Sequence, residues 1–165
     1  MPLRIPDIKA QLKRFGRDPG KYSQLPIRNL DSVASPGLGT LMFKTTVVSE
    51  SGKDSYTAYM QFFGIKFGEE KDLNLIIPAK VNNRLIYHAK PSINNNQVQL
   101  YCGCQDFRFR FSKPLYDNKS LIGNWQRYTR VTDHYPPVNP ENLCGYCKHI
   151  ESFLIALKAS GQITD

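Results

Sequence analysis

Two close pairs of Cys and His residues in this chain are of the types that bind a soft metal ion. The first pair is Cys102 and Cys104, and the second is Cys147 and His149. Thiolates and imidazoles are the usual ligands of Zn²⁺ in closed, four-coordinate structural sites. A catalytic zinc site keeps one position open and has an acid or base beside it, and the acids near these pairs show no such pattern. The spacing therefore favours a structural zinc ion that joins two parts of the chain.

Cys144 adds a fifth donor, because Cys144 and Cys147 form a C-x-x-C pair. Either His149 or Cys144 can complete a set of four, and the pairing favours His149. A C-x-x-C pair also occurs in thioredoxin-like redox proteins, but only 18 residues follow Cys147, too few to complete that fold. Two disulfides are the other use of four cysteines. The first ten residues lack the apolar stretch of a secretory signal, which favours a reducing compartment. We therefore favour a metal site over disulfides.

The order C-x-C and then C-x-H, on strands followed by a helix, resembles the SWIM zinc finger. Cys102, Cys104, Cys147 and His149 stand at the matching positions, and the interval between the two pairs is longer than is usual in that family. The resemblance covers about the last 70 residues. It implies a nucleic-acid-binding, protein-binding or scaffold role and no reaction.

A second resemblance rests on the run from Tyr101 to Phe111, a later Asn-Pro loop, and Cys-Lys-His-Ile at 147–150. This combination is similar to small proteins of tailed bacteriophages. It implies a component of the virion, such as the neck, tail or baseplate, assembled in the host cytoplasm. A protein of this kind that is not viral would be cytoplasmic.

The composition indicates one folded, basic domain. The chain has 165 residues, 41% hydrophobic residues, 19 aromatic residues (nine Tyr, nine Phe and one Trp) and a net charge of +8. These values exclude a disordered chain, and no apolar run approaches the ~20 residues that span a bilayer. The charge favours an acidic or nucleic-acid partner, or is a scattered, solvated surface. We find no P-loop, G-x-G-x-x-G or HExxH motif, and expect neither an enzyme nor a small-molecule substrate.

Hydrophobic periodicity places the elements that would position the metal ligands. A helix is predicted near 6–15 with a basic outer face, followed by an extended arm to residue 39 and a hairpin from 40 to 63. Further strands are predicted at 73–77, 84–88 and 97–102, and a last helix at about 144–160 that ends at Gly161. His88 falls in one of these strands and is interpreted as a hydrogen-bonded sheet residue.

Residues 106–111 alternate between Phe and charged residues, which predicts a strand that follows the first cysteine pair at the tip of a hairpin. The rings would face the core, and Arg108 and Arg110 would face water. The alternative is that these arginines, with Lys113 and Lys148, contact the phosphates of a nucleic acid.

Residues 112–141 lack a sustained period and contain Trp125, Arg127 and Arg130. Long irregular segments are often functional, and these residue types are enriched at interfaces. We therefore interpret the segment as a candidate contact surface. The alternative is that Trp125 packs beneath the sheet.

We thus expect an α+β fold with an antiparallel sheet, divided into an N-terminal helix and arm (1–39) and one domain (40–165) with a zinc module at about 97–161. The predicted function is that of a non-catalytic, zinc-stabilised structural or adaptor protein in a larger assembly, with other subunits as partners. A nucleic-acid-binding SWIM-like module is the alternative. We expect no membrane partner.

Overall fold

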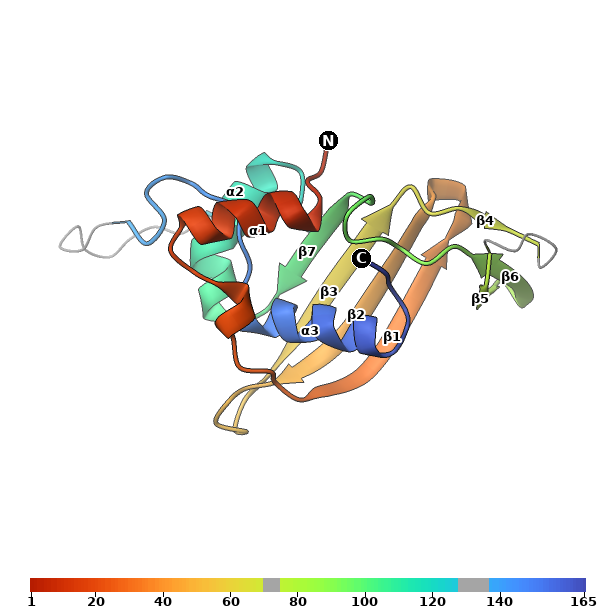
Figure 1. Cartoon of the computed structure of the whole chain (residues 1–165), viewed down its shortest axis with the longest axis horizontal. Helices are drawn as coiled ribbons and strands as arrows, with labels where there is room; N and C mark the ends of the chain where they lie inside the picture. Colours follow the sequence, from red (N-terminus) through yellow and green to blue (C-terminus); the bar gives the residue numbers. More distant parts are fainter. Residues whose placement is uncertain (70–74, 128–136) are drawn as a thin grey trace.

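The protein has an α+β fold built on a four-stranded antiparallel sheet (Figure 1). We describe residues 1–69, 75–127 and 137–165 of the chain from a computed structural model. The strand order is β1-β2-β3-β7, and a smaller sheet with the order β4-β6-β5 lies at one end. The strands are β1 (Ile27–Ser35), β2 (Thr40–Val48), β3 (Ser55–Phe63), β4 (Phe67–Gly68), β5 (Ile77–Val81), β6 (Arg84–His88) and β7 (Val98–Cys102).

Helices cover one face of the larger sheet, which we call the inner face. They are α1 (Ile5–Arg14), α2 (Ser112–Asp117) and α3 (Lys148–Ala159), with a π-helical segment, η3 (Phe107–Phe111), directly before α2. Figure 1 shows α3 crossing the sheet, with α1 and α2 at the end opposite the small sheet. None of the helices in the described part of the chain is long and apolar enough to cross a bilayer.

The predicted hairpin at 40–63 is confirmed as β2 and β3. Apolar residues at alternate positions, such as Leu41 and Phe43 on β2, are at most 1% exposed and contribute to the core. The residues between them, such as Met42 and Lys44, point to the opposite face of the sheet because side chains alternate along a strand. We call that opposite side the outer face.

Both predicted terminal helices are present. On α1 the Asp7 carboxylate accepts the backbone N–H of Arg4, 3.1 Å away, and Ile8 and Leu12 are fully buried at helical spacing. The last helix, α3, begins at Lys148 rather than near 144, and Gly161 follows it with a φ of 71°. A left-handed residue at this position ends a helix, as the sequence indicated.

Part of the predicted N-terminal arm is a strand of the sheet. Ile27–Ser35 forms β1, which pairs along β2, so the expected boundary at residue 39 falls between two paired strands. The sequence of β1 shows little alternation because it is an edge strand whose side chains are mostly exposed. A bulge between Arg28 and Asp31, with Asn29 at a φ of 54°, interrupts the pattern further.

The predicted strand at 106–111 is wrong. These residues are helical, and the first cysteine pair lies at the junction of a strand and a helix, not at a hairpin tip. Residues four apart share a helix face, so the same sequence places Phe107 and Phe111 together in the core. Asp106 and Arg110 form an ion pair at the same spacing.

The other predicted strands have different outcomes. Strands at 84–88 and 97–102 are confirmed as β6 and β7. Residues 73 and 74 of the predicted strand at 73–77 lie outside the described residues, 75 and 76 are not in a strand, and β5 begins at Ile77. His88 is buried in β6 with its Nδ1 atom 2.9 Å from the carbonyl oxygen of Ala89, as expected for a hydrogen-bonded sheet residue.

Candidate metal centre

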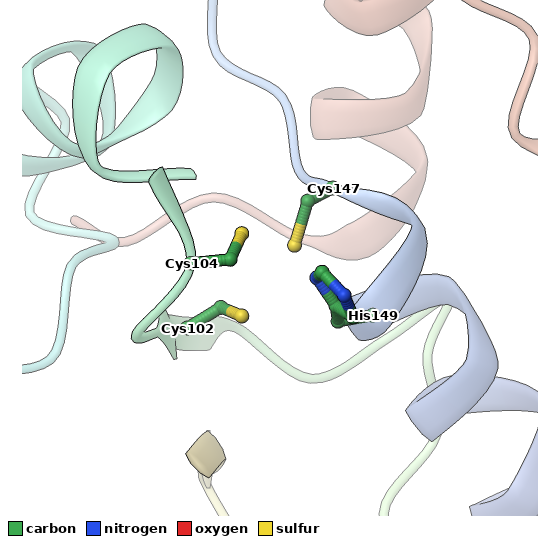
Figure 2. A group of neighbouring side chains, drawn as sticks. All are labelled: Cys102, Cys104, Cys147 and His149. Atoms are coloured by element: carbon green, nitrogen blue, oxygen red, sulfur yellow. The ribbon is translucent and has the colours of Figure 1, made fainter. Parts of the chain in front are cut away.

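The two ligand pairs meet in space. The three sulfur atoms of Cys102, Cys104 and Cys147 and a ring nitrogen of His149 all lie within 4.8 Å of one another. Figure 2 shows these four side chains pointing toward a common point. Ligands at ~2.3 Å from a tetrahedral zinc ion are about 3.8 Å apart, so only a small contraction would bring this group to coordination distance. The residues could therefore hold a metal ion.

The ends of two secondary-structure elements position the ligands. Cys102 is the last residue of β7, and Cys104 follows after Gly103, where the chain leaves the sheet. Cys147 is the N-cap of α3 and His149 lies in its first turn. The β7 strand pairs with β3, and α3 packs on the sheet, so the core holds the two ligand pairs close together.

The ring of His149 has the environment of a metal ligand. His149 is 5% exposed, and neither of its ring nitrogens has a hydrogen-bond partner among the described residues. A buried polar atom without a partner costs about 1–3 kcal/mol. Coordination of one nitrogen would remove part of that cost. The ring of Tyr56 packs against the imidazole with the centroids 4.8 Å apart, which restricts its orientation.

The thiols form a buried, mutually interacting group. Hydrogen bonds from Cys102 and Cys147 hold the pKa of Cys104 well below its usual value, whereas burial raises the pKa of Cys147. The backbone N–H of Phe107 also donates to the Cys104 sulfur over 3.3 Å. The cluster thus favours one thiolate at Cys104, and a bound cation would favour the thiolate form of all three.

Cys144 does not belong to this group of four. It is fully buried, and its thiol donates to the carbonyl oxygen of Pro114 and accepts from Asn118, both over 3.3 Å. Burial raises the pKa of Cys144 to about 11, which keeps the thiol neutral. Of the five possible donors in the sequence, the structure brings together Cys102, Cys104, Cys147 and His149.

Positive groups surround the cluster on its Cys147 side. Arg17 lines a cavity beside Cys147 and His149, and its guanidinium is 2.6 Å from the carboxylate of Asp106. Cys147 is also the N-cap of α3, and free N–H groups at a helix N-terminus favour negative charge. Three thiolates and a divalent cation carry a net charge of −1, which these groups would stabilise.

Arg108 and Arg110, the predicted contact pair, point in different directions because this segment is helical. Arg108 is exposed, with its guanidinium carbon 5.6 Å from the centroid of the Phe109 ring. Arg110 is half-buried in its ion pair with Asp106, which also binds Arg17. The arrangement of two guanidinium groups side by side on one face of a strand is therefore absent.

The remaining predicted contact residues are partly engaged within the molecule. The Lys113 ammonium lies 2.6 Å from Asp117 and 5.2 Å from the Trp125 ring centroid. Lys148 pairs with Glu50 at 3.0 Å. Trp125 is half-buried against the core, Arg127 is exposed, and Arg130 lies outside the described residues.

Two features that support the centre were not predicted. One is the hydrogen bond from Phe107 to Cys104, which depends on the helical turn that the Phe and Arg alternation concealed. The other is the close packing at Gly145, where a Cβ atom would lie 2.5 Å from Phe111 and 2.8 Å from Leu12. The Cys-Gly-Tyr-Cys sequence contains this glycine, but the sequence does not indicate that Phe111 and Leu12 pack against it.

Comparison of the chain with protein-family models, with curated proteins and with solved structures gave no match. The geometry of the four side chains and the surfaces around them are therefore what indicates a function.

Proposed function

We propose that this chain is a non-catalytic structural or adaptor protein of a larger assembly, in which a zinc ion bound by Cys102, Cys104, Cys147 and His149 stabilises the fold. The observation that carries the proposal is the convergence of three thiols and one imidazole in a buried group. Zinc is favoured over other metals because three sulfur ligands and one nitrogen ligand suit its tetrahedral preference.

A structural role is favoured because the four protein ligands leave no coordination position for a substrate or a water. The four ligand residues are each at most 5% exposed, so they form a buried group. The ligands also come from elements that are far apart in the sequence, and a bound ion would fasten α3 to the end of β7. Structural zinc ions contribute folding free energy in this way.

Membership of a phage particle is the more specific part of the proposal, and it rests on the resemblance of the Cys and His motifs. It is tested by locating the protein in purified virions by mass spectrometry. Its consistent recovery with particles would support a virion component, and its absence from intact particles would restrict the proposal to an assembly in the cytoplasm.

Metal analysis tests the centre itself. We expect one zinc ion per chain in the purified protein and a Co²⁺ derivative with the absorption of a tetrahedral, thiolate-rich site. Cys147→Ser should lose the metal. Cys144→Ser is the matched control and should retain it, because the Cys144 thiol is hydrogen-bonded to Pro114 and Asn118 and is not a ligand. Full metal content in Cys147→Ser would refute the proposed ligand set.

A further inference from the structure

The outer face of the larger sheet carries a row of side chains that crosses all four strands. Asp31 on β1 is opposite Lys44 on β2, Lys44 is opposite Tyr59 on β3, and Tyr59 is opposite Tyr101 on β7. Directly opposed residues of antiparallel strands lie on the same face with neighbouring side chains. The order of this row is therefore carboxylate, ammonium and two phenols.

The members of the row are in contact with one another. The Lys44 ammonium lies 5.7 Å from the Tyr59 ring centroid, and the Tyr59 and Tyr101 centroids are 5.8 Å apart. Lys44 is exposed, and Tyr101, on the edge strand β7, is 38% exposed. Two adjacent aromatic rings and a cation are thus available on an open sheet surface.

The aromatic row continues past the edge of β7 into a pocket. Tyr101 packs against Phe107 with ring centroids 6.2 Å apart, and both line a pocket of about 260 Å³ with Arg108 and Trp125. A planar ring system of the size of a nucleobase fits this volume. The row and the pocket together form a continuous track of rings with a basic group at each end, Lys44 and Arg108.

We propose that this track, formed by Lys44, Tyr59 and Tyr101 on the sheet and by Arg108 and Trp125 at the pocket, binds a single-stranded nucleic acid. Tyrosine rings on neighbouring strands of an open sheet provide stacking platforms for successive bases, and nearby cations contact the phosphates. The pocket accepts one further base. The binding is tolerant of sequence because every base has a face that can stack.

The chemistry of the outer face favours a nucleic acid over a protein partner. In the four strands, all of which the structure describes, Asp31 is the one acid on the outer face, where Arg28 and Lys44 are cations. A second row next to the aromatic one includes Gln61, whose amide can pair with base edges, opposite Gln99, whose amide N–H donates to the carbonyl oxygen of Lys119 over 3.0 Å. The net charge of +8 adds attraction for phosphates.

The sheet part of this surface faces away from the metal centre, whereas the pocket reaches it at Cys102. Tyr101 points to the outer face, whereas its neighbour Cys102 points to the inner face with the other ligands. The proposal differs from the sequence-based one, in which Arg108 and Arg110 formed the contact surface, because Arg110 is held by Asp106. Variants of Lys44 and Tyr101, which are not metal ligands, therefore test nucleic-acid binding in protein that retains its metal.

The test is fluorescence anisotropy of the metal-loaded protein with labelled single-stranded dT and U oligonucleotides and with a duplex of equal length. We expect tighter binding to the single strands. Three phosphate contacts, from Arg28, Lys44 and Arg108, predict a salt slope of about −2, so affinity should fall about fifteen- to twentyfold between about 50 and 200 mM salt. Equal or tighter binding to the duplex would overturn the proposal.

Variants of one tyrosine separate stacking from general attraction. Tyr101→Leu should weaken single-strand binding about five- to hundredfold, whereas Tyr101→Phe, which keeps the ring, should bind within about twofold of the natural protein. Lys44→Ala should reduce the magnitude of the salt slope by about 0.7. The matched control is Lys80→Ala, on exposed β5, which should leave binding unchanged.

Metal content and thermal unfolding of each variant show whether it is folded. An affinity of folded Tyr101→Leu equal to that of the natural protein would overturn the proposal. Equal effects of Lys44→Ala and Lys80→Ala would also overturn it, because the attraction would then come from net charge. An absence of binding even at about 50 mM salt would likewise overturn the proposal.

Discussion

The two faces of the four-stranded sheet differ in what surrounds them. Inner-face residues such as Leu41 and Phe62 are fully buried beneath the helices, and the four metal-ligand candidates lie on that side. Outer-face residues such as Lys44 and Tyr101 remain accessible. One face therefore supplies the stability of the fold, and the other can change its side chains at little cost and is available for binding.

Removal of the metal should have the largest effect on the inner face. Structural zinc has an apparent binding free energy of about 10–16 kcal/mol, which is comparable to the stability of a whole domain. We expect chelation at neutral pH to abolish the cooperative thermal transition seen by circular dichroism, and added Zn²⁺ to restore it. An unchanged transition in metal-free protein would contradict a stabilising role for the centre.

Truncation of a core ring compares the two faces directly. Phe43 packs edge-on against Phe62 with centroids 6.2 Å apart, and Phe43→Ala should lower the free energy of unfolding by about 3–5 kcal/mol because it leaves a cavity. Met42→Ala changes the adjacent outer-face residue and should cost less than about 1.5 kcal/mol. Denaturant titration measures both. Similar losses would show that the outer face is also part of a core.

A methyl group at Gly145 tests the packing beside the metal centre. The added Cβ would lie within 3 Å of Phe111 and Leu12, so these side chains or the backbone must shift. Gly145→Ala should cost about 1–3 kcal/mol without removing a metal ligand. Gly37→Ala is the control, since a Cβ at that position would meet nothing within 4 Å. Equal stabilities of the two variants would contradict the close packing at Gly145.

An effect confined to alkaline pH is expected from Cys144. Burial raises the pKa of its thiol from about 9 to about 11, so between these pH values the unfolded chain releases a proton that the folded chain keeps. Stability should be intact below pH 9 and decrease as the pH rises toward 11. The pH dependence of stability over this range should be shallower in Cys144→Ala. Identical slopes would show that Cys144 does not titrate as its burial implies.

The sequence predicted the fold best where one face of an element is buried. The hairpin of β2 and β3 and the helices α1 and α3 have clear apolar periods, and the structure contains all four. The edge strand β1 has no such period because most of its side chains are exposed. The segment at 106–111 has two periods at once, since the order Phe-Arg-Phe-Arg-Phe fits both alternation and a spacing of four.

The candidate site was predictable as a set of residues but not as an arrangement. Soft ligands in two close pairs indicated a metal centre, and spacing alone could not choose between His149 and Cys144. The choice depends on the N-cap position of Cys147, which directs His149 toward the other sulfurs, and on the contacts that hold Cys144 near Pro114. The outer-face row was not predicted because it depends on strand register.

The two ligand pairs are far apart in the sequence, which affects where the chain can accept insertions. A metal ion held by Cys104 and Cys147 would close a loop of 42 intervening residues into a ring. The entropy of closing a flexible loop grows only with the logarithm of its length, by about 0.6 kcal/mol per doubling. Inserted segments within that ring would therefore be tolerated, and relatives of this chain could carry additional modules there while keeping the same centre.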